Sequence, residues 1–189
     1  METAGFVLAG GRSSRMGRDK SLLELEGEAL VERAARQVSA AAGSVALVGD
    51  AGRHAKFGWP VVVDLRPGQG PLGGIESALA SPFAGQWNLI VACDMPYLDP
   101  ALLEKLIAEA RFRRPMCITA YTAQGVEPLC AVYAREFLDV ARRALDAGQR
   151  KVRDAFAGLY VVHLWTDNEG AVTNVNTPAE WASVTGETR

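Results

Sequence analysis

A short segment near the amino terminus concentrates residue types that bind phosphate. Residues 8–20 read LAGGRSSRMGRDK, with adjacent glycines, two serines and four basic side chains against a single acid. Glycines let backbone N–H groups approach phosphate oxygens, and fixed cations neutralise the phosphate charge. Because the whole chain has a formal net charge of −2, this basic character is local. A tight turn with solvated arginines is the alternative, but the full string favours a loop that binds a small polyphosphate.

The segment differs from the two common nucleotide-binding fingerprints. The GxGxxG motif of dinucleotide-binding proteins separates its first glycines by one residue, whereas Gly10 and Gly11 are adjacent. The P-loop requires GK[ST], but Gly17 is followed by Arg18. No serine lies in a GxSxG elbow, so serine catalysis is not indicated. The segment therefore represents a different phosphate-binding loop, and a dehydrogenase is not favoured.

Two aspartates and two asparagines are further candidates for chemistry. Asp64 and Asp94 each come directly after an apolar run, and Asn174 and Asn176 lie in the sequence NVNTP. A carboxylate such as Asp94 can hold Mg²⁺ together with phosphate oxygens, yet either aspartate could simply begin a turn. The asparagines could hold a ligand or the waters of a metal, or bond to local backbone. The residue types alone leave these alternatives open.

Length and composition are those of an ordinary globular protein. The 189 residues are 49% apolar and 22% charged, and we expect one domain over residues 1–189. The absence of a broad basic excess argues against a nucleic-acid partner. The first residues lack a basic n-region and an apolar h-region, and no apolar run approaches the about 20 residues that span a bilayer. We therefore expect no signal peptide and no membrane association.

The cysteines and histidines predict a protein that works in a reducing compartment and contains no structural metal site. Cys93, Cys117 and Cys130 lie inside apolar runs, which predicts buried free thiols in the cytoplasm. No CxxC or Cys/His cluster is present, and His54 and His163 are far apart in the sequence. A zinc site is therefore not expected.

The elements that must position these residues alternate between short apolar runs and longer amphipathic ones. This alternation predicts an α/β fold with a mainly parallel, twisted sheet and helices on both faces, a three-layer Rossmann-like arrangement. Expected strands cover residues 6–9, 45–48, 61–63, 88–93, 116–121, 129–133 and 160–164. Expected helices cover residues 30–42, about 75–80, a segment capped by Asp99, 136–147 and a last segment capped by Thr177. Glu127 and Pro128 are expected to break regular structure.

Strand polarity predicts that the candidate residues meet. Ligands of parallel sheets bind beyond the carboxyl ends of the strands. The glycine-rich loop, Asp64 and Asp94 all follow expected strands, so we expect them to face one crevice.

These motifs together resemble those of the molybdenum cofactor guanylyltransferase family, MobA-like nucleotidyltransferases. The resemblance runs in unbroken order from Phe6 to about Val184 and rests on the following strings: LAGGRSSRMGRDK, VVVD, GPLGG, CDMPY, EP at residues 127–128, GQRKVRDAF and NVNTPAEW. Glu127 stands where some members have histidine, and the loop is one residue shorter than in some members. A solvated helix start and contact with the acceptor both remain open for Arg150–Arg153.

The resemblance implies a role for each matched residue. Backbone groups of Leu8, Ala9 and Gly10 would meet the guanine nucleotide, and Gly11 would continue the phosphate cradle. The other matched side chains are assigned as follows: Arg15 and Lys20 to the phosphates, Asp64 to guanine or nucleotide recognition, Asp94 to magnesium, and Asn174 and Asn176 to the acceptor and the metal. Arg15, Lys20 and Asp94 are therefore the expected catalytic residues.

The resemblance also implies the reaction. GMP would pass from GTP to the terminal phosphate of molybdopterin-bound molybdenum, with Mg²⁺ as cofactor and pyrophosphate as the second product. Small-molecule substrates, and transient contact with proteins that deliver or receive the cofactor, are the implied partners. The alternatives are a cytidylyltransferase acting on molybdopterin, a sugar-phosphate nucleotidyltransferase and a nucleotide-binding module without turnover.

Overall fold

A seven-stranded sheet organises the computed structural model, which describes residues 2–10 and 19–185. The strand order is β5-β4-β1-β6-β8-β7-β9. The strands are β1 (Thr3–Leu8), β4 (Ala46–Val48), β5 (Val61–Val62), β6 (Trp87–Ala92), β7 (Cys117–Thr122), β8 (Gly125–Ala134) and β9 (Val161–Trp165). All neighbouring pairs are parallel except those of β8, which runs antiparallel to both β6 and β7. The expectation of a mainly parallel sheet is confirmed.

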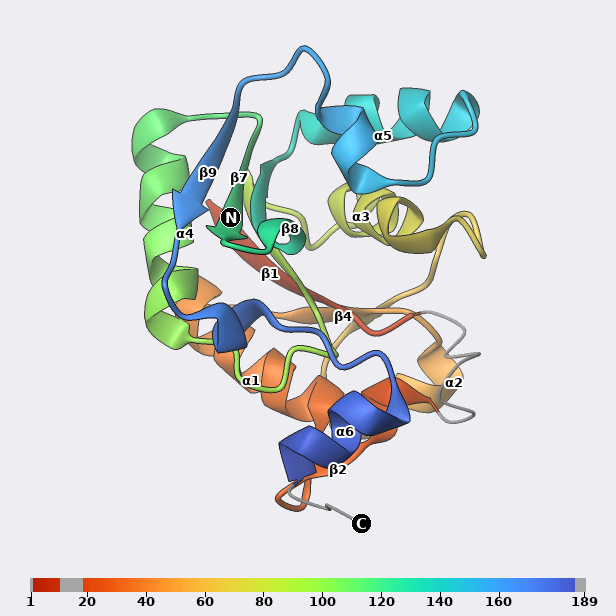
Figure 1. Cartoon of the computed structure of the whole chain (residues 1–189). Helices are drawn as coiled ribbons and strands as arrows, with labels where there is room; N and C mark the ends of the chain where they lie inside the picture. Colours follow the sequence, from red (N-terminus) through yellow and green to blue (C-terminus); the bar gives the residue numbers. More distant parts are fainter. Residues whose placement is uncertain (1, 11–18, 186–189) are drawn as a thin grey trace.

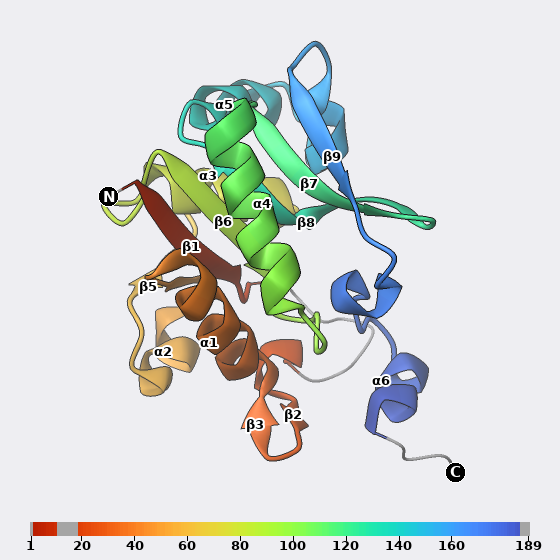
Figure 2. The same ribbon diagram turned by 90° about the vertical axis from the view of Figure 1, so that its left-hand side faces the viewer.

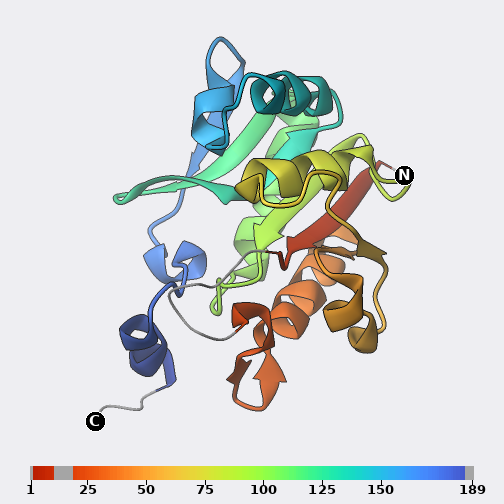
Figure 3. The same cartoon turned by 90° about the vertical axis from the view of Figure 1, so that its right-hand side faces the viewer.

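Helices cover both faces of this sheet, which confirms the three-layer fold. The main helices are α1 (Leu30–Ala42), α3 (Gly70–Ala80), α4 (Pro100–Arg113) and α5 (Phe137–Asp146). Figure 1 shows α1 and α4 on one side of the sheet and α3 and α5 on the other. In Figure 2 the face under α1 and α4 is turned toward the viewer, and Figure 3 shows the opposite face under α3 and α5.

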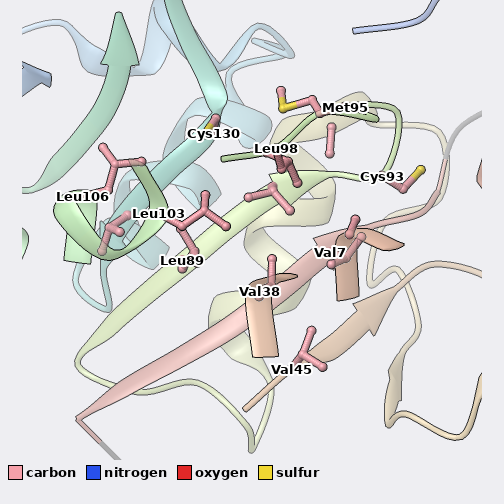
Figure 4. Packing of buried hydrophobic residues seen from close by; sticks show 14 of the residues in the cluster. Val7, Val38, Val45, Leu89, Cys93, Met95, Leu98, Leu103, Leu106 and Cys130 are labelled. Atoms are coloured by element: carbon pink, nitrogen blue, oxygen red, sulfur yellow. The ribbon is translucent and has the colours of Figure 1, made fainter. Parts of the chain in front are cut away.

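Each face has its own buried cluster because strand side chains alternate between the two faces. Val7 packs with α1 and α4, whereas its neighbours Phe6 and Leu8 pack with α3 and α5. Figure 4 shows the first cluster, in which Leu89 of β6 lies close to Leu103 of α4. Burial on both faces explains why the central strands are almost continuously apolar in sequence.

Shortening a central side chain should lower stability strongly. Leu89 is fully buried, so Leu89→Ala removes apolar contacts and leaves a cavity, and we expect unfolding free energy to fall by about 2–5 kcal/mol. Urea unfolding followed by circular dichroism measures the change. Leu65→Ala is the matched control: Leu65 is 58% exposed, so an effect within about 0.5 kcal/mol is expected. Equal losses in the two variants would contradict the assignment of Leu89 to the core.

Several helix ends lie where the sequence predicts them. Gly43 ends α1 in the left-handed region at φ 77°, which a residue without Cβ adopts readily. Asp99 caps α4 by accepting a hydrogen bond from the N–H of Ala101 at 2.9 Å. Thr177 caps α6 (Pro178–Thr185), since its hydroxyl accepts from the N–H of Glu180 at 3.2 Å.

The predicted start of α3 was wrong by several residues. The helix begins at Gly70 rather than near Ile75, because Pro71 occupies its first turn and favours helical φ. Gly73 and Gly74 lie inside the helix, although their low helix propensity favours a loop. A Cβ on Gly74 would lie 3.3 Å from Leu8 Cδ2, so glycine here lets α3 pack closely on β1.

The predicted break at Glu127 and Pro128 was only partly right. Strand β8 begins at Gly125 and runs through both residues. The ladder with β7 is nevertheless interrupted there, since Ala120 pairs with Glu127 while Thr119 pairs with Ala131. Pro128 lacks a donor for the ladder, which accounts for the bulge.

Smaller elements complete the chain. They are β2 (Glu24–Leu25), β3 (Glu28–Ala29), α2 (Ala51–His54) and the 3₁₀ helices η1 (Lys20–Leu22), η2 (Ala55–Phe57), η3 (Val152–Phe156) and η4 (Glu169–Val172). Strands β2 and β3 form a separate antiparallel pair. Helices η1 and α2 contact each other through Ser21 and His54, and through Asp19 and Arg53.

Candidate active site

The carboxyl ends of β1, β5 and β6 bring the predicted site residues to one edge of the sheet. Gly10 comes shortly after β1, Asp64 after β5 and Asp94 after β6. A Cβ atom built on Gly10 would lie 3.4 Å from Asp64 Oδ2, so this carboxylate borders the start of the glycine-rich loop. Gly11 and Arg15 lie outside the described residues.

Backbone groups at the end of β1 are partly used by the sheet itself. The N–H of Ala9 donates to the Val48 carbonyl at 2.9 Å, and the Leu8 carbonyl accepts from the N–H of Cys93 at 3.1 Å. These bonds fix the strand end and the backbone leading into the loop. A nucleotide meeting this segment through backbone would use other groups, such as those of Gly10.

Lys20 joins the loop to the end of β6. Its Nζ lies 3.2 Å from Asp94 Oδ2 and 2.7 Å from Asn176 Oδ1. The Lys20 and Asp94 side chains are only 16% and 17% exposed. A cation and a carboxylate from distant parts of the sequence therefore meet in a largely desolvated place, and the amide of Asn176 joins them from the exposed side. The prediction that Lys20 and Asp94 lie close together is confirmed.

The segment around Asn176 is fixed by backbone and capping contacts. The N–H of Val175 donates to the Asp94 carbonyl at 2.9 Å. Glu180 Oε2 accepts from the N–H groups of Asn176 at 2.5 Å and of Thr177 at 2.9 Å. Together with the Thr177 hydroxyl these bonds form a capping box at the start of α6. The asparagine that contacts Lys20 is thus held by the helix that follows it.

Asn174 contacts a different carboxylate, which the sequence left without a role. Its Nδ2 donates to Glu127 Oε2 at 3.1 Å, while Glu127 Oε1 accepts from the N–H of Leu129 at 3.0 Å. The same glutamate lines a cavity of about 180 Å³ with Arg153 and Thr173. The bulge in β8 turns this side chain toward Asn174, and only the EP motif of the resemblance hinted at it.

Burial raises the pKa of three carboxyl groups at this edge. Desolvation raises the pKa of Asp94, and the charge and hydrogen bond of Lys20 oppose this rise. Desolvation also raises the pKa of Glu127, against the bonds from Leu129 and Asn174. Burial alone raises the pKa of Asp64. Charged groups held at a cost in desolvation are typical of functional sites.

The oxygen ligands present at this site fit a hard divalent cation. Asp94 supplies a buried carboxylate, and Asn176 supplies an amide oxygen that already faces a positive charge. Within residues 2–10 and 19–185, no group of three or more His, Cys, Asp or Glu side chains could by itself hold a metal. Mg²⁺ commonly binds through one or two carboxylates plus substrate phosphates and waters, so a sparse oxygen set of this kind suits it.

Two further properties of the described chain bear on its class. Cys93, Cys117 and Cys130 are buried and free, as predicted. None of the helices in the described ranges combines the length and the apolar character that crossing a bilayer requires.

Comparison with known proteins gives the family. The MobA-like NTP transferase domain matches residues 5–162. The chain is 34% identical to a probable molybdenum cofactor guanylyltransferase of Carboxydothermus hydrogenoformans, over 93% of this chain and 91% of the relative. It is 31% identical to the molybdenum cofactor guanylyltransferase of Shewanella baltica, over 92% of this chain and 91% of that protein.

A solved structure agrees with these sequence relatives. The crystal structure of molybdopterin-guanine dinucleotide biosynthesis protein A from Archaeoglobus fulgidus superposes with a TM-score of 0.84. It is 27% identical in sequence, and the match covers 97% of each chain. Since both the domain and relatives above 30% identity span most of the chain, this protein belongs to the MobA-like NTP transferase family and is a nucleotidyltransferase.

Proposed function

We propose that this protein transfers GMP from GTP to the terminal phosphate of molybdopterin-bound molybdenum and releases pyrophosphate. The observation that carries the proposal is the meeting of Lys20, Asp94 and Asn176 beside the glycine-rich loop. The names of the relatives support the nucleotide and the acceptor. An oxygen of the acceptor phosphate forms the new bond to the α-phosphorus, and the bond from that phosphorus to the β-phosphate oxygen breaks.

The chain's own residues act mainly by position and charge. An ionised phosphate is already a nucleophile near neutral pH, so the reaction needs no strong general base. The barrier lies in bringing two anions together, which fixed cations lower. Lys20 is a point charge suited to the leaving pyrophosphate, and Arg15 of the loop, with its planar fork, would share that task.

Asp94 would hold Mg²⁺ in this site. When bound, the ion would neutralise charge on the nucleotide phosphates. Lys20 Nζ donates a hydrogen bond to Asp94 Oδ2, and this bond orients the carboxylate toward Lys20. Asn176 keeps Lys20 in reach by accepting from its ammonium group.

The remaining predicted residues divide between nucleotide and acceptor. Leu8, Ala9, Gly10 and Gly11 would face the guanine nucleotide through those backbone groups that the sheet does not use, with Asp64 beside Gly10. Asn174 and Asn176 would lie toward the acceptor and the metal. The cavity beside Glu127 adjoins Asn174 and supports an acceptor on that side.

The decisive experiment incubates the purified protein with GTP, Mg²⁺ and molybdopterin-bound molybdenum. We expect the guanine dinucleotide by mass spectrometry, with an equal amount of pyrophosphate. A panel with CTP and with sugar phosphates tests the related transferase reactions. Pyrophosphate release with CTP but not with GTP would replace this proposal by cytidylyl transfer, and no release with any nucleotide would indicate a binding module.

Replacing Asp64 tests the choice of base. The N1–H and N2–H₂ groups of guanine are donors that a carboxylate accepts, and cytosine lacks that edge. We expect Asp64→Ala to lower the preference for GTP over CTP by about tenfold, the size of a lost hydrogen bond to a charged group. Rates with GTP, ITP and CTP measure this preference.

Asp64→Asn is the matched variant, since it keeps an acceptor oxygen without the charge. We expect it to retain more of the preference than Asp64→Ala. Unchanged discrimination in both variants would remove Asp64 from base recognition.

The cellular setting remains part of the proposal. Three free buried thiols support work in a reducing cytoplasm. Transient contact with proteins that deliver or receive the molybdenum cofactor follows from the proposed product.

A further inference from the structure

His54 is buried between Gly49, at the end of β4, and Ser21 of η1. It ends the short helix α2, is only 1% exposed, and its Nε2 lies 3.0 Å from Ser21 Oγ. On the other side it borders Gly49, where an added Cβ would lie 3.3 Å from His54 Cε1 and 3.1 Å from the Gly10 nitrogen. One imidazole therefore lies beside Gly49, which itself adjoins Gly10, and bonds to Ser21 in the segment that follows residues 11–18.

The direction of the hydrogen bonds around His54 follows from donor chemistry. Ser21 Oγ lies 2.7 Å from Asp19 Oδ1, and a carboxylate only accepts, so the single hydroxyl hydrogen of Ser21 points to Asp19. Ser21 Oγ is then an acceptor toward His54, which must carry its hydrogen on Nε2. Burial lowers the pKa of His54, although Asp19 and Asp50 oppose this, so the neutral form is favoured. The bonds run in one direction, from His54 through Ser21 to Asp19.

Asp19, the first described residue after residues 11–18, accepts the last hydrogen bond of this chain. Its Oδ1 also accepts from the N–H of Ser21 at 3.1 Å, which caps η1. Its Oδ2 pairs with Arg53 Nη1 at 2.8 Å, so α2 holds Asp19 a second time. Lys20 is the residue between Asp19 and Ser21, and its backbone is consequently fixed on both sides.

We propose that His54 is a positioning residue for the nucleotidyl transfer: through Ser21 and Asp19 it fixes the turn from which Lys20 reaches Asp94. The hydrogen bond of His54 goes to Ser21, whereas Lys20 Nζ bonds to Asp94 and Asn176. Its contribution is geometric. A displacement of about 1 Å at a reacting site can lower a rate by ~10²-fold, so a loosened η1 turn reduces turnover more than nucleotide binding.

The activity test rests on the proposed guanylyl transfer and uses four single variants and one double variant. His54→Phe removes the donor, Ser21→Ala removes the relay, and His54→Gln restores an N–H near the position of Nε2. His163→Phe is the matched control, because His163 Nδ1 lies 2.8 Å from Thr119 Oγ1 in a similar pair on β7 and β9. We expect kcat to fall about 10- to 30-fold in His54→Phe and Ser21→Ala, with KM for GTP changed by less than about threefold.

Rescue and non-additivity separate positioning from a general structural role. We expect His54→Gln to recover kcat to within about threefold of the parent and His163→Phe to leave it unchanged. Because His54 and Ser21 act in one chain, the double variant should lose no more than the worse single variant. A loss of kcat that His54→Gln does not recover, or one that follows only the fraction of unfolded protein, would overturn the proposal.

An activity-independent measurement keeps this inference distinct from the proposed reaction. Hydrogen exchange of the amides of residues 19–23 should quicken in His54→Phe and Ser21→Ala but not in His163→Phe. Unchanged exchange in the first two variants would refute the positioning role, whatever the protein transfers. Quickened exchange in a protein that transfers no GMP would uphold the anchoring of the turn by His54 and refute the guanylyl transfer itself.

Discussion

Asp94→Asn should abolish most nucleotidyl transfer while leaving the fold as stable as before. The substitution keeps the shape of the side chain and removes the charge that pairs with Lys20 and would hold Mg²⁺. Loss of one charged group at a preorganised site typically lowers the rate by ~10²–10³-fold, and we expect that range for kcat at saturating GTP and Mg²⁺. Pyrophosphate release measures the rate.

The expected effect on stability is small, because two contributions oppose each other. Burial raises the folded-state pKa of Asp94 above its ordinary value, so protonation favours the folded state and this contribution disappears as pH rises through that pKa. At neutral pH the ionised Asp94 therefore lowers stability, and a neutral Asn relieves that cost. The melting temperature of Asp94→Asn should stay close to that of the parent, because this relief is offset by the loss of the anion beside Lys20, whose ammonium group keeps Asn176 Oδ1 as an acceptor.

Asp99→Asn is the matched control, since it makes the same substitution later in the same segment. Asp99 caps α4, and asparagine caps a helix about as well, so neither rate nor melting temperature should change. If Asp94→Asn kept a normal rate at saturating nucleotide and Mg²⁺, the assigned role of Asp94 would be wrong. A lowered melting temperature with a normal rate would indicate a purely structural residue.

The central part of this site was predictable because strand polarity is a strong constraint. Once the apolar runs before Gly10 and Asp94 are assigned to parallel strands, their following residues must lie at the same sheet edge. The pairing of β1 with β6 brings Gly10 and Asp94 to the same edge, whereas the contact of Lys20 with Asp94, 74 positions apart, also depends on the placement of η1. Asn176 joins them through backbone bonding after η4, which periodicity does not predict.

The parts that sequence did not predict depend on tertiary contacts. Gly73 and Gly74 read as loop by propensity, but close packing of Gly74 on Leu8 and of Gly73 on Gln69 outweighs that preference. Glu127 reads as a breaker beside proline, but a bulge in β8 places it against Asn174. The wide separation of the histidines in sequence argued only against a metal site, whereas the tertiary fold buries His54 and gives it Ser21 as a partner.

Lys20→Met should also lower kcat by ~10²–10³-fold, because it removes the point charge assigned to the departing pyrophosphate and keeps the aliphatic stem. Unlike Asp94→Asn, it should lower the melting temperature. Methionine leaves the Asp94 carboxylate in a desolvated place without its cation, and an unpaired buried charge destabilises more than a removed pair. Lys105→Met, at an exposed position of α4, is the control and should change neither quantity.

The double variant Lys20→Met/Asp94→Asn distinguishes catalysis from simple ion pairing. If the two side chains stabilise the fold only through each other, the double variant should recover the melting temperature that Lys20→Met alone loses. Its transfer rate should stay at least as low as that of either single variant, since both charges are absent from the site. Recovery of the rate together with the melting temperature would mean that Lys20 merely neutralises Asp94, and its assignment to the phosphates would fail.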